Sequence, residues 1–462
     1  MKGRGYVRGV KWSVIWIFAL ALPVLFLPGC EPGARNTVTP TGAETSNDYV
    51  GSDACRECHE GVYRGWQTTF HAQKFQPTNE DFIIGDFDFN NSVEAGGKKT
   101  TMTREGESYL VTTPGPDSEV NTYPIKFVLG SIWKQRYITE FPNGELHALP
   151  VQWNVITGQW AEYRGLGSQK PGDGEFWSDK EQIFQYECMG CHTSNSKVVY
   201  DKETKKYTTS WQEMGVGCES CHGPGGNHVR SDLTAKFDTI VNPPRIPDPR
   251  RASMVCGACH DVGRSEDSRY AYPVNYRPGD FLQFHLEKDE RTYPDGSPRT
   301  HHQQYNDWQS SGHARAGVMC WDCHSPHVRG KFNRFQLKLP GSLLCSTCHA
   351  TIARVGAHSI HSTNNCIGCH MPNTINSATP GDLRSHAMTV VRPEWTVAAG
   401  GDLEKQPNSC NLCHYHKDYD PERMAHFLAA VRKPEVCTNC HAHAEEDPED
   451  YPFPAPSALG RP

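Results

Sequence analysis

The sequence predicts a mainly α-helical and irregular fold, with one small β-rich module near residues 81–180. Its composition is the first reason, because 33 prolines and 41 glycines among 462 residues, with only 37% hydrophobic residues, suit one large conventional core poorly. The second is a short motif, Cys-x-x-Cys-His, that occurs nine times. The third is the long interval between its first two copies, where residues alternate as they do in strands.

The nine motifs use eighteen of the 19 cysteines, and we number them in chain order. Their cysteine pairs are Cys55/Cys58, Cys188/Cys191, Cys218/Cys221, Cys256/Cys259, Cys320/Cys323, Cys345/Cys348, Cys366/Cys369, Cys410/Cys413 and Cys437/Cys440, followed by His59, His192, His222, His260, His324, His349, His370, His414 and His441. Two cysteines at this spacing can form thioethers with the vinyl groups of one porphyrin, and the next histidine then supplies an axial imidazole to iron. The motifs predict nine covalently attached haem c groups, whose apolar macrocycles would supply much of the interior.

Two other uses of paired cysteines fit less well. Structural zinc sites also use Cys-x-x-Cys units, but they do not require a histidine directly after every pair. A disulfide framework suits small secreted domains that lack a core, and a chain of 462 residues with a real apolar fraction has no such need.

The amino end predicts export. Basic residues precede an apolar run at residues 12–26, which is too short for an ordinary membrane-spanning helix and is typical of a secretory signal over residues 1–29. The sequence Leu-Pro-Gly-Cys that ends at Cys30 resembles the lipobox of bacterial lipoproteins, in which the cysteine is acylated. Cys30 is also the one cysteine outside the motifs. An uncleaved amphipathic anchor, or a cysteine that is near a cleavage site by chance, is the alternative.

We therefore expect an exported lipoprotein, periplasmic or in the outer membrane, held on a membrane by its lipid. Attachment of c-type haem on the outer side of the bacterial inner membrane agrees with export. The predicted segments are a lipidated tether at 30–48, a first haem segment at 49–80, the β-rich haem-free module at 81–180, a three-motif group at 181–265, a connecting segment at 266–303, a five-motif group at 304–450 and a proline-rich tail at 451–462.

Within the β-rich module, residues 109–113 and 125–129 alternate as strands do. Residues 136–141 and 145–149 predict a hairpin across Pro-Asn-Gly at 142–144.

An internal repeat relates residues 63–72 to residues 305–314. Tyr, Trp, Gln, His and Ala recur in register, and each copy ends in a histidine outside the motifs, His71 or His313. A repeated helix that carries a second axial ligand for iron explains this pattern.

The 23 histidines leave fourteen outside the motifs (23 − 9 = 14), enough for a second imidazole at all nine irons. Two imidazoles fill the iron and suit it to electron transfer, whereas an open position would permit substrate chemistry. The distal candidates are His71, His228, His313, His327, His358, His361 and His386, followed by His302, His416, His426, His443 and His285. We expect His147, in the haem-poor module, to be no ligand, and Met319 and Met371 to pack beside haems rather than bind them.

The formal charge is -7, and nine ferric haems with ionised propionates bring it to roughly -16. Such an acidic surface excludes nucleic acid as a partner and favours a basic redox protein.

Several segments resemble one family. They are Tyr-Val-Gly-Ser-Asp-Ala-Cys at 49–55 with Trp66 and His71, Gly-Val-Gly-Cys-Glu-Ser-Cys-His-Gly-Pro-Gly at 215–225, Gly-Val-Met-Cys-Trp-Asp-Cys-His-Ser-Pro-His at 317–327, Cys-Ile-Gly-Cys-His-Met-Pro at 366–372 and Ser-Cys-Asn-Leu-Cys-His at 409–414. They are similar to multihaem cytochrome c proteins related to the tetrahaem cytochrome that accepts electrons from hydroxylamine oxidoreductase, and the resemblance runs from about 49 to 441.

This resemblance implies haems stacked in parallel and perpendicular pairs, mostly with two histidine ligands, the distal one from a remote segment. The wider superfamily includes octahaem oxidoreductases and nitrite reductases. The Cys-x-x-Cys-Lys variant that marks the catalytic haem of pentahaem nitrite reductases is absent from this sequence, so no motif stands out as an active site.

The sequence thus favours an electron-transfer protein over an enzyme, one that passes single electrons between redox partners. If neighbouring irons lie about 10 Å apart at an effective dielectric near 20, one charge shifts the next site by about 1.7 kcal/mol, or roughly 70 mV. One alternative is a multihaem reductase of a small nitrogen or sulfur oxyanion at one open haem. The other is a subunit of an extracellular cytochrome filament, and a homo-oligomer or a complex with other cytochromes is left open.

Overall fold

A computed structural model describes residues 47–164, 166–289, 291–330, 335–351, 365–412 and 417–431. By its contacts the chain divides into Met1–Thr45 and Ser46–Pro462, and the description concerns the second unit. The predicted signal peptide, the acylated Cys30, most of the tether and the proline-rich tail lie outside the described residues. In the described segments, no helix has the length and apolar character needed to cross a bilayer.

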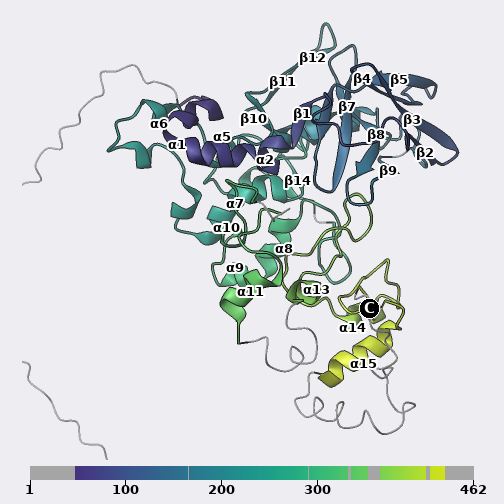
Figure 1. The fold of residues 1–462 in the computed structure, drawn as a ribbon, viewed down its shortest axis with the longest axis vertical. Coiled ribbons are helices and arrows are strands. Elements are labelled where there is room, and N and C mark those ends of the chain that lie inside the picture. Colours follow the sequence, from purple (N-terminus) through teal and green to yellow (C-terminus); the bar gives the residue numbers. More distant parts are fainter. Residues whose placement is uncertain are drawn as a thin grey trace, which may run out of the picture. The chain divides into compact units, whose positions relative to one another are not determined.

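The expected β-rich module contains two antiparallel sheets (Figure 1). One has the order β2 (Ser92–Ala95), β3 (Lys98–Glu105), β4 (Ser108–Pro114) and β5 (Val120–Pro124), and the other has the order β1 (Phe75–Pro77), β6 (Phe127–Leu129), β7 (Lys134–Glu140), β8 (Leu146–Asn154) and β9 (Gln159–Glu162). The predicted hairpin is confirmed, because β7 pairs with β8 in a register that brings Glu140 opposite Leu146.

A conventional apolar core fills this module. Met102, Tyr137, Leu149 and Trp177 are fully buried in one cluster, and the Trp177 indole donates a hydrogen bond to the carbonyl of Pro114 at 2.9 Å. The alternating pattern buries one face of β4, whereas every residue of β8 is buried.

The remaining chain consists of short elements joined by long irregular segments. Its strands are β10 (Thr193–Ser194) with β13 (Glu213–Met214), β11 (Lys197–Asp201) with β12 (Lys206–Ser210), and β14 (Gly263–Arg264) with β15 (Glu287–Lys288). Its helices are α1 (Ser52–Gln67), α2 (Phe70–Gln73), α3 (Phe184–Glu187), α4 (Met189–His192), α5 (Cys218–His222), α6 (Gly226–Arg230), α7 (Pro249–His260), α8 (Gln304–Ser310), α9 (Gly312–Arg315), α10 (Cys320–Cys323), α11 (Ser342–His349), α13 (Cys366–His370), α14 (Pro393–Ala398) and α15 (Pro421–Val431), with 3-10 turns η1 (Lys180–Gln182), η2 (Lys236–Asp238), η3 (Pro243–Arg245) and η4 (Leu282–Phe284).

The predicted fold class is confirmed in part. Short helices and irregular segments carry the motifs, but several small antiparallel sheets make strands a substantial share of the structure beside the helices. The hairpin β11–β12 was not predicted, although its strands are rich in the β-branched and aromatic residues that favour strands. The expectation of a mainly helical chain was therefore too strong.

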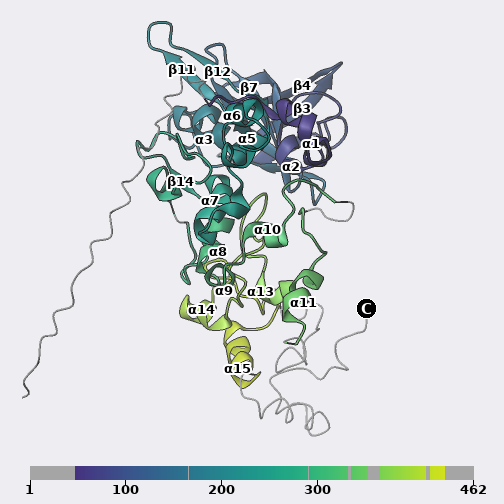
Figure 2. The same ribbon diagram turned by 90° about the vertical axis from the view of Figure 1, so that its left-hand side faces the viewer.

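Buried carboxylates fasten the start of α1 to the third motif. Glu219 accepts hydrogen bonds from the backbone amides of Val50, Gly51 and Gly225 at 2.9, 2.8 and 2.7 Å. Glu213 accepts a further bond from the amide of Ser52 at 3.0 Å. These contacts join segments that are remote in sequence, and Figure 2 shows α1 and α5 close together.

The first copy of the internal repeat folds as α1 followed by the single turn α2. The Thr69 hydroxyl caps this turn by accepting a hydrogen bond from the amide of Ala72 at 3.3 Å. The Trp66 indole donates to the carbonyl of Val216 at 2.9 Å, and the Val216 amide donates to the carbonyl of His71 at 2.8 Å. This copy is thereby docked just before the third motif.

The second copy, α8 followed by α9, repeats each contact. The Ser311 hydroxyl accepts from the amide of Ala314 at 3.1 Å. The Trp308 indole donates to the carbonyl of Val318 at 3.0 Å, and the Val318 amide donates to the carbonyl of His313 at 2.9 Å. The predicted repeated helix is confirmed, and its second copy docks just before the fifth motif.

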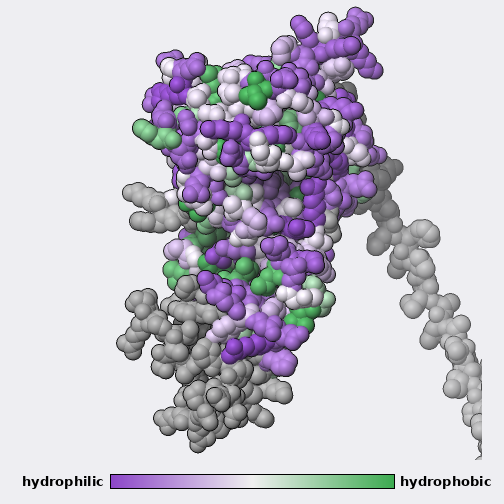
Figure 3. Space-filling model, turned by 90° about the vertical axis from the view of Figure 1, so that its right-hand side faces the viewer, coloured by the Kyte–Doolittle hydropathy of each residue, from purple (hydrophilic) through white to green (hydrophobic). Residues whose placement is uncertain are grey.

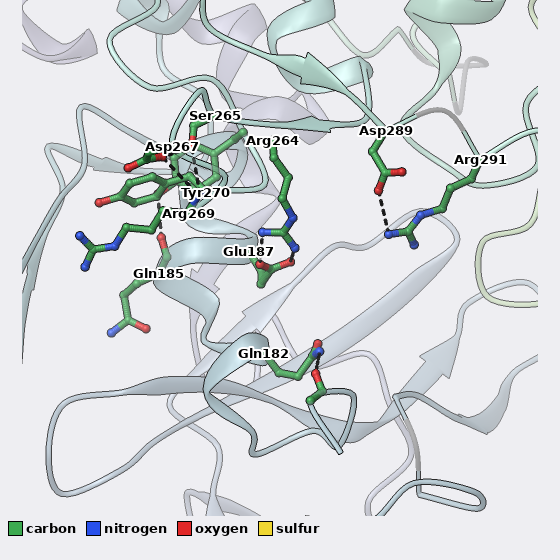
Figure 4. Close-up of polar contacts among 12 residues, drawn as sticks. Gln182, Gln185, Glu187, Arg264, Ser265, Asp267, Arg269, Tyr270, Asp289 and Arg291 are labelled. Atoms are coloured by element: carbon green, nitrogen blue, oxygen red, sulfur yellow. Dashed lines mark hydrogen bonds and ion pairs between the residues drawn. The ribbon is translucent and has the colours of Figure 1, made fainter. Parts of the chain in front are cut away.

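The second motif is clamped by the segment around β14. Glu187 forms a two-pronged ion pair with Arg264 at 2.9 and 3.3 Å, visible in Figure 4. The Tyr272 hydroxyl donates to the carbonyl of Gln185 at 2.7 Å, which fixes the Tyr272 ring against Gly190 of the motif.

We expect Gly190→Ala to lower the free energy of unfolding by about 1–3 kcal/mol, because its Cβ would overlap the fixed ring of Tyr272. Urea denaturation followed by far-ultraviolet circular dichroism measures the change. Gly61→Ala in α1 is the matched control, since no atom lies within 4 Å of its added Cβ, and it should be neutral or slightly stabilising. Equal denaturation midpoints for the Gly190→Ala variant and the native chain would show that the Tyr272 ring moves aside without cost, which would contradict this prediction.

Candidate haem-binding site

Seven of the nine motifs are described completely, each within or at the end of a short helix. Of the eighth motif only Cys410 is described, while Cys413, His414, Cys437, Cys440 and His441 lie outside the described residues. The described cysteines are free thiols. In the same part of the chain, no group of three or more His, Cys, Asp or Glu side chains is placed to hold a metal ion.

Three predicted attachment cysteines are more exposed than the others. Cys58, Cys348 and Cys369, the second cysteines of the first, sixth and seventh motifs, are exposed, whereas the other described motif cysteines are partly buried. The sequence could not distinguish these three from the rest, because all nine motifs have the same spacing.

The exposure of these three thiols has a local cause. In the first, sixth and seventh motifs it is the first cysteine, Cys55, Cys345 or Cys366, that packs against a neighbouring motif. The second cysteine of each of these motifs is exposed. Haem attachment through the three exposed thiols stays a prediction.

Six motif histidines each face one histidine from outside the motifs. The ring centroids are 6.3 Å apart for His59 and His228, 6.4 Å for His192 and His302, 6.1 Å for His222 and His327, 6.3 Å for His260 and His71, 6.4 Å for His324 and His386, and 5.9 Å for His349 and His313. Two imidazoles on opposite sides of one metal, with metal–nitrogen bonds of about 2.0 Å and about 1.1 Å from nitrogen to ring centre, have ring centres about 6.2 Å apart. Each pair therefore leaves room for one iron.

Backbone and side-chain acceptors hold many of these rings. The acceptors for Nδ1 are the carbonyls of Val241 for His222 at 2.8 Å, Lys236 for His228 at 2.9 Å, Phe335 for His324 at 3.0 Å and Arg384 for His386 at 3.1 Å, and the side-chain oxygen of Gln304 for His260 at 3.2 Å. Because an oxygen acceptor requires a proton on Nδ1, the other ring nitrogen keeps the lone pair that binds a metal.

Burial also keeps several rings in the form that binds metals. It lowers the pKa of His71 to about 3 and the pKa values of His260 and His386 to about 4. Only the neutral imidazole is a ligand, so these sites favour coordination at neutral pH.

Unsatisfied polar atoms near the second motif provide a further test of fit. Lys134 Nζ and His301 Nδ1 are buried without a hydrogen-bond partner. An ionised haem propionate would satisfy such a cation, since buried charges require a partner of opposite sign. The donor set around this motif therefore fits a haem.

The motifs also contact one another through their cysteines. The thiols of Cys55 and Cys218, Cys191 and Cys259, Cys256 and Cys320, and Cys345 and Cys366 lie against each other, and Cys221 and Cys259, like Cys323 and Cys345, are close enough for their charges to interact. The first, third, fourth, fifth, sixth and seventh motifs thus form one continuous series, and the second joins it at the fourth.

The internal repeat extends to these sites. The ring planes of His222 and His327 differ by 16° and those of His260 and His71 by 86°, at the third and fourth motifs. At the fifth and sixth motifs the angles are 22° and 90°. In both copies, the repeat docks before one motif and supplies the facing histidine of the next.

Other predicted residues are placed differently. His426 is exposed in α15, and the ring of His285 packs against Tyr276 with its Nδ1 near the carbonyl of Val274 at 3.1 Å. His147 is fully buried in β8, with its Nδ1 3.2 Å from the carbonyl of Trp177. His358, His361, His416 and His443 lie outside the described residues.

His301 was missed by the sequence analysis. Its ring centroid lies 4.4 Å from that of His302, and its Nδ1 is buried. The His301-His302 doublet was the available signal, but only the second of the two residues was chosen as a candidate.

Comparisons with known proteins agree with the motifs. The family model described as cytochrome c554 and c-prime matches residues 54–94 and 168–223, and the model described as a doubled CXXCH motif matches residues 313–354. The crystal structure of outer cell wall cytochrome OcwA superposes with a TM-score of 0.58 at 19% identity, covering 86% of this chain and 92% of that one, and thus shares the fold.

Three curated relatives match over shorter stretches. The cytochrome c nitrite reductase subunit NrfA of Nitratidesulfovibrio vulgaris is 22% identical over 29% of this chain and 32% of that protein. The dissimilatory sulfite reductase MccA of Wolinella succinogenes is 22% identical over 71% and 51%, and the multiheme cytochrome MtrA of Shewanella baltica is 27% identical over 35% and 52%. The chain spans about half or less of the length of these relatives.

We expect two classes of low-spin signal in electron paramagnetic resonance of the oxidised, haem-loaded protein. The mutual orientation of two axial rings sets the splitting of the iron orbitals, so the pairs at 13°, 16° and 22° should give rhombic spectra and those at 86° and 90° highly anisotropic ones. His313→Ala should remove one spin per protein from the anisotropic class and leave the rhombic class unchanged. A single uniform class would contradict the ring geometry.

Proposed function

We propose that this chain is a multihaem c-type cytochrome that carries nine covalent haem c groups and conducts electrons between redox partners, supported by its matches to two haem-motif family models and by its shared fold. The observation that supports this function best is the set of six facing imidazole pairs. An iron with imidazole on both sides has no open position for substrate, which suits it to electron transfer.

The pairs define the proposed ligands. The eighteen motif cysteines hold the haems, with Cys58, Cys348 and Cys369 attached at the solvent-facing edge of their sites. His228, His302, His327, His71, His386 and His313 are the distal ligands of the first to sixth motifs in order. For the seventh to ninth motifs, we propose distal ligands among His358, His361, His416 and His426, opposite His370, His414 and His441.

When bound, each haem supplies an iron that accepts or gives one electron. The polypeptide fixes the geometry around it: the carbonyls of Val241, Lys236 and Phe335 hold the imidazoles in one tautomer. Ligands that stay in place in both oxidation states keep the reorganisation energy of electron transfer small. No bond is made or broken in the transfer. Contacts between motif cysteines place successive sites side by side.

We further propose a location and partners. Acylated Cys30 would hold the exported chain on the periplasmic or outer-membrane surface, where it would exchange electrons with basic redox proteins, alone, as a homo-oligomer or within a cytochrome complex. The formal charge of -7 supports a basic partner, and the face in Figure 3 is largely hydrophilic with small scattered apolar patches. A hydroxylamine oxidoreductase is one candidate donor, given the resemblance of the motifs.

His327→Ala should convert one haem per protein from low-spin to high-spin, because the third-motif iron loses the imidazole that faces His222. Electron paramagnetic resonance measures this change. His285→Ala is the control, since that ring lies against Tyr276 and not against a motif histidine, and it should leave the spectrum unchanged. An unaltered spectrum for His327→Ala would exclude this pairing.

The electron-transfer function is tested by reoxidation of the haem-loaded, dithionite-reduced protein. A basic ferric cytochrome c should oxidise it rapidly, at a rate that falls by about tenfold or more between low and physiological salt as the charge attraction is screened. Nitrite, sulfite and hydroxylamine should leave it reduced. Turnover with one of these, together with a high-spin signal that shifts when it is added, would favour the reductase alternative.

A further inference from the structure

The second motif has cationic surroundings. Lys134 and Arg136 project from β7, and Arg164 follows β9 closely. The charge of Arg136 acts on both Cys188 and His192, and that of Arg164 acts on Cys188. The charge of Lys134 acts on His301 and His302, the distal side of the same site. Lys74 also acts on His192 and His302, and burial lowers the pKa of Lys134 well below its ordinary value, so Lys134 needs an anionic neighbour such as a haem propionate to keep its charge. Basic side chains therefore surround one haem position.

These cations have little to neutralise them within the protein. Arg136 stacks over the Tyr163 ring at 3.7 Å, and its Nε contacts the side-chain oxygen of Gln152 at 3.3 Å. In the described part of the chain, none of Lys134, Arg136 and Arg164 forms an ion pair with a carboxylate.

Two carboxylates face this group, and both are engaged elsewhere. Glu187 interacts with Arg164 but forms its two-pronged ion pair with Arg264 (Figure 4). Asp382 interacts with Lys134 but accepts hydrogen bonds from the backbone amides of residues 377 and 378 at 2.7 and 2.8 Å.

The proximal histidine of this motif also differs from those of the third, fourth and fifth motifs. His192 Nδ1 is buried without a hydrogen-bond partner, whereas the corresponding nitrogens of His222, His260 and His324 have oxygen acceptors. An acceptor at Nδ1 makes an imidazole a stronger electron donor and stabilises ferric iron. A site without it favours the reduced state.

The first and third motifs have the opposite surroundings. Glu213 and Glu219 act on Cys55, and Glu213 also acts on Cys218. Carboxylates near an iron disfavour an added electron, and cations favour it, most strongly where water is excluded. The local charge around the sites thus changes from negative, at the carboxylates of the first and third motifs, to positive at the second motif.

We propose that Lys134, Arg136 and Arg164 hold the second-motif haem at the most positive reduction potential among the seven described motifs. Electrons that enter the series from either side then accumulate on the second-motif haem. This haem joins the series at the fourth motif. The three residues are positioning residues, because they would shift the reduction potential of the haem through their charge and do not bind iron. The inference depends on haem attachment, which is part of the proposed function.

Redox titration of the haem-loaded protein, followed optically, tests this role. In Lys134→Gln and in Arg136→Gln, the most positive one-electron component should move to lower potential, its equilibrium constant falling about tenfold, which is 59 mV for one electron. Arg136→Lys keeps the charge and should restore most of the loss. The other components should stay in place.

Lys126→Gln is the matched control, because this lysine lies in the same module but is exposed and paired with Glu140. It should leave the whole titration unchanged. If the most positive component stays fixed in both Lys134→Gln and Arg136→Gln, or moves equally in Lys126→Gln, the inference is wrong. A pyridine haemochrome assay that finds nine haems in every variant separates this failure from a failure of the proposed function, which would appear as missing haem.

Discussion

The facing of two imidazoles, at a separation that leaves room for one iron, is the constraint on which the rest of this fold depends. Each of the six described pairs joins a motif histidine to a histidine from another segment, as His59 to His228 and His71 to His260. The backbone must therefore return repeatedly to sites fixed elsewhere, which explains the long irregular segments between short helices. Side-chain packing alone could not specify these returns, because the composition supplies too few apolar residues outside the β-rich module.

Local hydrogen bonds fix where these remote segments dock. Trp66 and Trp308 each donate to a valine carbonyl just before a motif, and the same valine amide donates to the carbonyl of the histidine that faces the next motif. One docking contact thus positions two sites at once. The agreement of the ring angles in both copies, 16° with 86° and 22° with 90°, shows that the docking unit and the pair of sites behave as a single duplicated module.

The sequence predicted the parts of this arrangement that are local. A hairpin across Pro-Asn-Gly, strands with alternating polarity and a repeated helix all follow from short patterns, and each is present. Which distal histidine faces which motif could not be predicted, since the pairing is between remote segments and every candidate has the same chemistry. The charges of Lys134 and Arg136 were missed for the same reason: in sequence they look like polar residues of a strand, and only the fold brings them to the second motif.

In the proposed charge gradient, buried charge is the main means of giving the series a direction. Where every described pair offers the same two imidazoles, ligand type cannot distinguish one site from the next, so differences in potential must come from hydrogen bonds at Nδ1 and from neighbouring ions. Glu213 and Glu219 are already needed to fasten α1 to the third motif, and Arg136 already packs on Tyr163. The residues that stabilise the fold are therefore the same ones that set its electrostatic gradient, and a substitution at Glu219 should disturb both together.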